Sequence, residues 1–170
     1  MGLKESGLRG SLRNVSVGTD AIPDSVAVRP EDTRSISRDG NDDRHGLEVT
    51  LKDDWPSFGA RISSMTSGAT RAYLHEEDGG ESGDLIESKD ISNLSAGDAV
   101  TFDNVDLNDG QVVFVTADAE GGDWDMGEAE DATDYPYTSD FVDITNAVTF
   151  NTSGESGARV FSEVGNVGFD

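Results

Sequence analysis

From Gly46 onward, apolar and polar residues alternate along much of this chain. Leu47, Val49 and Leu51 are apolar, and the residues between them are polar. Because successive side chains of a β-strand point to opposite faces, this alternation predicts a strand with one buried face.

Similar runs recur about every ten residues, with Gly, Asn and Asp between them. They cover residues 60–62, 69–74, 84–87, 99–102, 111–117, 142–145, 147–150, 158–161 and 164–169. Residues 111–117 form the most continuous apolar run, so we expect them at the centre of the core. The spacing is typical of an antiparallel sandwich or barrel with almost no helix. We predict an all-β fold, an antiparallel β-sandwich of the jelly-roll type.

The first part of the chain has no sustained period of either 2.0 or 3.6 residues. Pro23 and Pro30 disfavour helix around them, and the DGNDD sequence at 39–43 is typical of a turn or hinge. We therefore predict two regions, an extended N-terminal arm (1–45) and an acidic β-sandwich domain (46–170). The apolar arm residues expected to dock on a partner are Leu8, Leu12, Val15, Val17 and Ile22.

The charge is strongly negative and unevenly distributed. The whole chain has 35 acidic and 12 basic residues and a formal net charge of −23. Residues 1–45 contain seven basic and eight acidic residues, whereas residues 46–170 contain five basic and 27 acidic residues. In dilute buffer the negative charges of this acidic domain repel one another. At molar salt the screening length falls to about 3 Å, so the charge pattern indicates adaptation to brine.

Composition also argues against several classes of protein. The chain has no cysteine, so disulfides, thiolate metal sites and cysteine nucleophiles are excluded. We expect no membrane insertion and no signal peptide, because no apolar run is long enough. We expect no nucleic-acid partner, because the acidic body would repel phosphate.

Acidic clusters are the candidate cation sites. Asp118, Asp123 and Asp125 surround the Gly121–Gly122 turn, and further clusters lie at 106–109 and 39–43. Their oxygens suit Ca, Mg or Na ions, although none of the clusters has the spacing of a calcium-binding helix–loop–helix. The alternative is a solvated surface without a specific ion, and we expect no other cofactor.

Catalytic motifs do not emerge from the sequence. His45 and His75 lack the spacing of a metal-binding pair, and no G-x-S-x-G nucleophile motif is present. Carboxylate pairs occur throughout so acidic a chain and therefore carry no information. We expect a binding or structural protein rather than an enzyme.

Aromatic residues in loop-like sequence are the candidate receptor contacts. Trp124, Tyr135 and Tyr137 fall between predicted strands, where their rings would suit stacking on a sugar. The alternative is that they pack over the ends of the core.

Short motifs resemble those of structural proteins of haloarchaeal tailed viruses. The motifs are SLRNVSV (11–17) and AIPDS (21–25) in the arm, and DISNLSAG (90–97), TAD (116–118) and YPYTS (135–139) in the body. The resemblance implies an attachment leader that carries a β-rich domain facing the host or the medium.

Together these observations predict a virion surface protein, assembled in the host cytoplasm. It would be a tail fibre or baseplate appendage, or a capsid turret or spike, that takes part in host attachment. Its partners would be other virion proteins through the arm, further copies in a trimer or pentamer, and a host surface glycan or S-layer. The alternative is a secreted or cell-surface carbohydrate-binding adhesin module of a haloarchaeon.

The charge analysis predicts a dependence of folding on salt. We expect the protein to lose its β-sheet circular dichroism when salt is lowered below about 0.5 M, because unscreened carboxylates then repel one another. Dialysis series in NaCl and KCl measure the effect. An undiminished sheet signal in dilute buffer would contradict the prediction.

Overall fold

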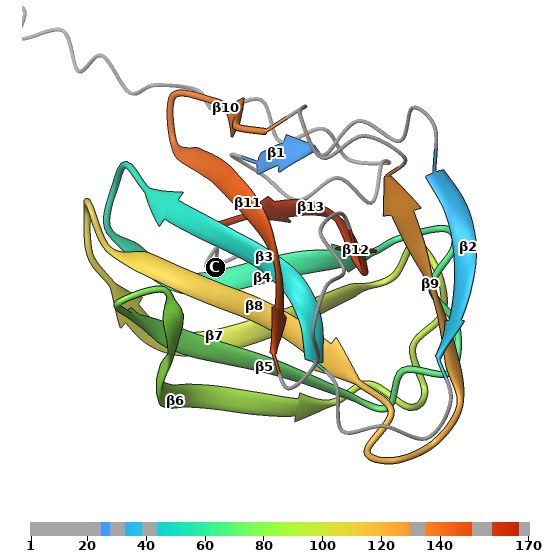
Figure 1. Ribbon diagram of the computed structural model, residues 1–170. Helices are drawn as coiled ribbons and strands as arrows, with labels where there is room; N and C mark the ends of the chain where they lie inside the picture. The colour runs from blue at the N-terminus through green and yellow to red at the C-terminus, as the bar shows by residue number, and fades with distance from the viewer. Residues whose placement is uncertain (1–24, 28–32, 39–43, 130–134, 151–157, 167–170) are drawn as a thin grey trace, which may run out of the picture.

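The computed structural model describes residues 25–27, 33–38, 44–129, 135–150 and 158–166. These residues form thirteen β-strands and no helix (Figure 1). All the strand pairs are antiparallel. The prediction of an all-β antiparallel sandwich is therefore confirmed.

One layer of the sandwich is a six-stranded sheet. Its strands, in spatial order, are β10 (Tyr137–Thr138), β11 (Val142–Phe150), β3 (Arg44–Leu51), β8 (Val112–Asp118), β5 (Arg71–Asp78) and β6 (Glu81–Asp90). The run predicted to be central corresponds to β8, which lies between β3 and β5. Its central position is confirmed.

The other layer is a four-stranded sheet, and a small third sheet accompanies the two. The four-stranded sheet has the order β1 (Ser25–Ala27), β13 (Phe161–Gly165), β4 (Trp55–Ile62) and β7 (Ala99–Leu107). The third sheet has the order β12 (Ala158–Arg159), β9 (Trp124–Ala129) and β2 (Thr33–Arg38).

The strand pairs are nested in the sequence. β5 pairs with β6, β4 pairs with β7 outside them, and β3 pairs with β8 outside those. A long antiparallel ribbon that rolls up on itself produces this nesting, and jelly rolls are built in this way. β11 then extends the sheet beside β3, and β13 extends the other sheet beside β4.

The two layers contribute different side chains to the core. The four-stranded sheet contributes the aromatic residues Trp55, Phe58, Phe102 and Phe161, all at most 1% exposed. The six-stranded sheet contributes mainly aliphatic residues: Leu47, Val49, Leu51, Leu74, Val113, Val115 and Ile144. Rings from one layer thus pack on branched side chains from the other, as expected of two interdigitating sheet faces.

The structure corrects the predicted boundary between arm and body. The boundary between His45 and Gly46 falls inside β3. Two segments assigned to the arm belong to the sheets, because β1 pairs with β13 and β2 pairs with β9. Their backbone groups complete sheets of the body, a long-range pairing that the local sequence pattern does not reveal. The part of the arm N-terminal to Ser25 lies outside the described residues.

β8 is buried on both of its faces. Val113, Val115 and Ala117 belong to the core between the two main sheets. Phe114, Thr116 and Asp118, which alternate with them, are at most 3% exposed on the face that points away from the four-stranded sheet. We call this second face the outer face. Phe114 packs there against Phe150, with ring centroids 5.2 Å apart.

The absence of a side chain at Gly46 allows the close approach of β3 and β8. A Cβ atom at this position would lie 2.6 Å from Cα of Thr116 and closer still to the carbonyl oxygen of Val115. Both are backbone atoms, so the clash cannot be relieved by rotating a side chain. The sheet therefore requires glycine at position 46.

We expect Gly46→Ala to lower the free energy of unfolding by more than about 2 kcal/mol, because the strand has to shift. Gly79→Ala is the matched control: Gly79 has φ +64° and its added Cβ would meet no atom within 4 Å, so about 1 kcal/mol is expected. Urea unfolding in molar salt, followed by circular dichroism, measures both. Equal losses would contradict the packing argument.

Candidate functional site

Trp124 belongs to the hydrophobic core and does not lie in a loop. It is the first residue of β9, is 3% exposed, and lies with its ring centroid 5.7 Å from that of His45. The backbone at Trp124 pairs with Arg38 of β2. The prediction that this residue lies in an exposed loop is therefore wrong, because Trp124 is part of a strand and its ring is buried. Burial of so large an apolar ring stabilises the fold.

Tyr135 and Tyr137 are half-buried at the edge of the six-stranded sheet. They flank Pro136, which follows a cis peptide bond, and their rings meet edge to face with centroids 5.2 Å apart. Both rings pack against the core, and part of each stays accessible. Of the three aromatic candidates, these two keep a surface that a receptor can reach. The arm candidates (Leu8, Leu12, Val15, Val17 and Ile22) lie outside the described residues.

The structure does not gather the three predicted cation ligands into one site. Asp118 is buried at the end of β8, whereas Asp123 is exposed in the turn before β9. Asp125 lies within β9 and accepts a hydrogen bond from the hydroxyl of Ser67 at 3.3 Å. Among the described residues, no group of three or more acidic or histidine side chains is placed to hold a metal ion.

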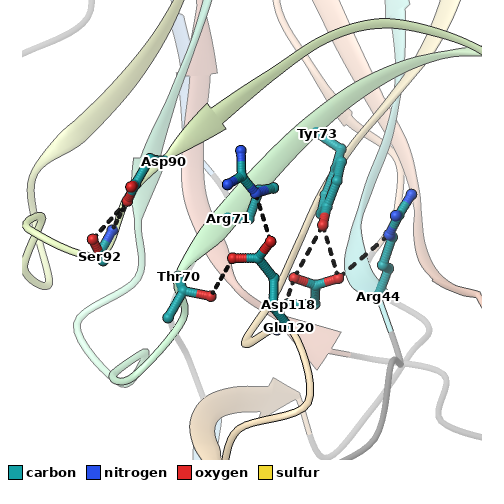
Figure 2. A network of polar contacts seen from close by, with 8 residues as sticks. All are labelled: Arg44, Thr70, Arg71, Tyr73, Asp90, Ser92, Asp118 and Glu120. Carbon is teal, nitrogen blue, oxygen red and sulfur yellow. Dashed lines mark hydrogen bonds and ion pairs between the residues drawn. The ribbon is translucent and has the colours of Figure 1, made fainter.

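Four polar residues that the sequence analysis did not connect meet on the outer face. Arg44 of β3, Tyr73 and His75 of β5 and Asp118 of β8 form what we call the Arg44 cluster (Figure 2 shows all but His75). The guanidinium carbon of Arg44 lies 3.6 Å from the centroid of the Tyr73 ring. Arg44 therefore stacks on an aromatic face while its nitrogens donate to two other residues.

Asp118 is the acceptor of the Arg44 cluster. The Tyr73 hydroxyl donates to its carboxylate oxygens at 3.1 and 3.3 Å, and Nε of Arg44 donates at 3.4 Å. The backbone N–H of Glu120 also donates, at 3.2 Å. The Asp118 side chain is 5% exposed, and a carboxylate buried to this degree needs such donors to offset its lost hydration.

His75 is held in one neutral form. Nη1 of Arg44 lies 3.1 Å from Nε2, and the carbonyl oxygen of Gly83 lies 3.2 Å from Nδ1. Because a guanidinium can only donate, Nε2 accepts and Nδ1 carries the hydrogen. Burial lowers the pKa of His75, and the nearby positive charge of Arg44 lowers it further, against the opposing effect of the Gly83 bond.

Tyr73 is held in its protonated form. Burial raises the pKa of its phenol, and the negative charge of Asp118 raises it further. The phenol therefore remains a hydrogen-bond donor over the whole neutral and mildly alkaline range.

A second, more exposed network lies beside the first (Figure 2). Nε of Arg71 donates to Glu120 at 2.8 Å, and the hydroxyl of Thr70 donates to the other carboxylate oxygen at 3.2 Å. The bond to Glu120 raises the pKa of Arg71. Ser92 donates to Asp90 through both its hydroxyl and its backbone N–H, which lowers the pKa of that carboxyl. The contacts of Glu120 fasten the start of β5 to the turn after β8, whereas those between Asp90 and Ser92 are local to the end of β6.

The Arg44 cluster contains the residue types of acid–base catalysis, yet its members are engaged with one another. Both ring nitrogens of His75 have partners, and both carboxylate oxygens of Asp118 accept hydrogen bonds. Proton transfer to a substrate would first require these contacts to break. The geometry favours a structural role in joining β3, β5 and β8.

The cluster was missed because its members are separated in sequence by 31 residues (Arg44 and His75) and 74 residues (Arg44 and Asp118). The available signal was Tyr73 and Thr116, which stand between apolar residues of the predicted strands 69–74 and 111–117, with His75 and Asp118 directly after those strands. Such interleaving indicates that the second face of the strand is also covered.

A hollow of about 320 Å³ lies beside β9. It is lined by Ser64, Met65, Thr66, Ser67, Gly68, Leu94, Ser95, Ala96 and Asp125. Four of these residues carry hydroxyl groups and one carries a carboxylate. The hydroxyls of Thr66 and Ser67 already donate, to the carbonyl oxygen of Val160 and to Asp125.

No family model, curated protein or solved structure matches this chain. In the part of the chain that the structure describes, no helix is long and apolar enough to span a membrane.

The lowered pKa of His75 predicts acid sensitivity. In the unfolded chain this residue takes up a proton near pH 6.5, whereas in the fold it stays neutral to lower pH. The unfolded state then binds more protons, so the free energy of unfolding falls as pH drops below about 6.5, by at most about 1.4 kcal/mol per pH unit.

We expect His75→Asn to remove this part of the slope, since asparagine can still donate to Gly83 but does not titrate. Urea unfolding at constant salt between pH 5 and pH 8 measures both proteins. Parallel stability curves for the wild type and the variant would show that another group is responsible.

Proposed function

We propose that this chain is a non-enzymatic virion structural protein of a halophilic archaeal virus, displayed as an oligomeric surface appendage. A tail fibre or baseplate position suits it best, with a capsid turret or spike next. The short viral-like motifs in the arm and body and the acidic exterior of a β-sandwich support this proposal together.

The observation that carries the proposal is the imbalance of exposed charge. The five Lys and Arg side chains that the structure describes are Arg44, Lys52, Arg61, Arg71 and Lys89, and each forms an ion pair with a carboxylate. Of these five side chains, Lys52 is exposed and the other four are half-buried. Exposed carboxylates are far more numerous: Asp53, Asp54, Glu76, Asp78, Glu81, Asp84, Asp90, Asp98, Asp103, Asp106, Asp109, Glu120, Asp123 and Asp140. Such a surface suits permanent exposure to brine.

The mutual engagement of the Arg44 cluster supports a binding role over catalysis. Its histidine, tyrosine and aspartate, the natural acid–base groups of the chain, hold three strands together. Function on this proposal lies in two surfaces, the arm and the edge at Tyr135 and Tyr137.

The arm would anchor the chain to other virion proteins and to further copies in a trimer or pentamer. The anchoring residues on this proposal are Leu8, Leu12, Val15, Val17 and Ile22, which all precede Ser25, the first residue of β1. A clean separation of anchor from sandwich therefore falls near residue 24, and not at residue 45.

Tyr135 and Tyr137 would contact the host surface. The accessible part of each side chain suits a glycan or an S-layer protein, although the hydroxyl of Tyr135 is itself buried. Trp124 plays no part in this contact, because the fold buries it.

Removal of residues 1–24 tests the anchor. We expect the truncated protein to keep its sheet circular dichroism, because both main sheets are intact, and to fall at least about tenfold in incorporation into particles, because its anchor is lost. Immunogold labelling and quantitative mass spectrometry of purified particles measure incorporation. Wild-type incorporation of the truncated chain would overturn the anchoring role, and absence of the full chain from particles would overturn the virion assignment.

A secreted or cell-surface adhesin of a haloarchaeon is the second candidate function. The hydroxyl-lined hollow at Ser64–Gly68 and Leu94–Ala96 favours it, because sugars are bound by polar groups of this kind. Fractionation of cells discriminates the two: an adhesin is found in envelopes of uninfected cells, and a virion protein is found in particles.

A further inference from the structure

β6 presents the longest free sheet edge in the described structure. It has ten residues, pairs with β5, and ends the six-stranded sheet. An edge strand exposes unpaired backbone N–H and C=O groups that can accept another strand. In Figure 1 it lies on the opposite side of the sandwich from β1.

The other edges are less suited to pairing. β7 ends the four-stranded sheet, but Asn104 and Asp106 within it have positive φ values of 57° and 48°. Such left-handed residues disrupt the regular alternation of backbone groups. β1, β10 and β12 have two or three residues each, and β2 has six. β6 is longer than any of these, although its own pairing with β5 shifts register twice between Leu74 and Glu77. The stretch from Glu87 to Asp90 pairs regularly, and β6 is therefore the edge with most capacity to accept a strand.

The side chains of β6 select the kind of strand that can bind. Glu81 and Asp84 are exposed, and Leu85 is 53% exposed beside them. Glu87 is already paired with Lys89 at 2.7 Å. Two β6 strands brought together would place carboxylates against carboxylates, so the edge disfavours itself and favours a strand with positive charge and apolar side chains.

One segment of this chain has that chemistry. Residues 8–17, LRGSLRNVSV, contain Arg9 and Arg13, four apolar residues and no acidic residue. Their ten residues match the ten residues of β6 in number, and the regularly paired end of β6, residues 87–90, is where an added strand would find an uninterrupted edge. Every other part of the chain that is apolar enough for a strand is already in a sheet or is acidic.

We propose that residues 8–17 of one copy pair with β6 of a neighbouring copy and so add a seventh strand to its six-stranded sheet. This inference rests on the proposed function, since it identifies the acceptor of the anchoring arm. A neighbouring copy is the partner because of the place where each chain's own arm joins the sandwich. The arm leads into β1, an edge strand of the four-stranded sheet that lies on the opposite side of the sandwich from β6 (Figure 1). Head-to-tail contacts of this kind form a closed ring when the rotation between copies closes, as in a trimer or pentamer.

Single-cysteine variants test the contact in the full-length protein, which has no cysteine of its own. Ser11→Cys or Ser16→Cys chains are mixed with size-tagged chains that carry Ser82→Cys or Ser88→Cys on β6. We expect disulfide-linked pairs of one tagged and one untagged chain, and the preferred combination gives the direction of the added strand. Tagged chains with Asp103→Cys on β7 are the matched control. Cross-linking to the control as efficient as to β6 would overturn the proposal.

Charge reversal provides an independent measurement. Arg9→Glu with Arg13→Glu, and separately Glu81→Arg with Asp84→Arg, should each weaken self-association at least about tenfold in sedimentation velocity at fixed salt. A mixture of the two variants should recover association, because the arm of the first now complements the edge of the second. Asp103→Arg should leave association unchanged. Circular dichroism confirms that each variant is folded.

The outcomes separate this inference from the proposed function. A folded wild-type chain that stays monomeric at all concentrations overturns the arm–β6 contact, whether or not the chain is found in particles. Specific cross-linking of arm to β6, in a chain found in cell envelopes and not in particles, supports the contact and overturns the virion assignment.

Discussion

Burial of β8 on both faces is the constraint around which the neighbouring strands are arranged. Its inner face needs only apolar partners, and β3, β5 and the four-stranded sheet supply them. Its outer face includes the carboxylate of Asp118, which would be costly to bury without donors. Arg44 and Tyr73 reach that carboxylate from the strands on either side of β8. The same contacts that neutralise the aspartate therefore also join three strands.

Positive and negative side chains are not balanced on the exterior of the domain. Each positive side chain that the structure describes is paired with a carboxylate, whereas exposed carboxylates far outnumber these partners. Exposed ion pairs contribute little to stability, so the excess acid is tolerated mainly because dissolved salt screens it. Residues of the core and the Arg44 cluster are expected to decide whether the chain folds, and the surface decides in which medium it does so.

The strands from β3 to β8 pair in a nested order, so most of them have a neighbour on both sides, and β6 is left at one edge of its sheet. On our proposals the arm of one copy covers that edge in the next. Specificity would then have two sources. The acidic edge would disfavour pairing between two β6 strands, and the two arginines of the arm would favour pairing between the arm and β6.

The sequence by itself determined the fold class, the central position of β8 and most strands, because alternation and turn residues act over neighbouring positions. The pattern predicts two strands at 142–145 and 147–150, yet these residues form one strand, β11, with an irregularity between Ile144 and Asn146. Only the tertiary structure decided that β1, β2 and β9 belong to sheets, that Trp124 is buried, and that Arg44, Tyr73, His75 and Asp118 meet. Each of these depends on contacts between distant residues, and the free energy of such a contact comes from burial and pairing that no local pattern records.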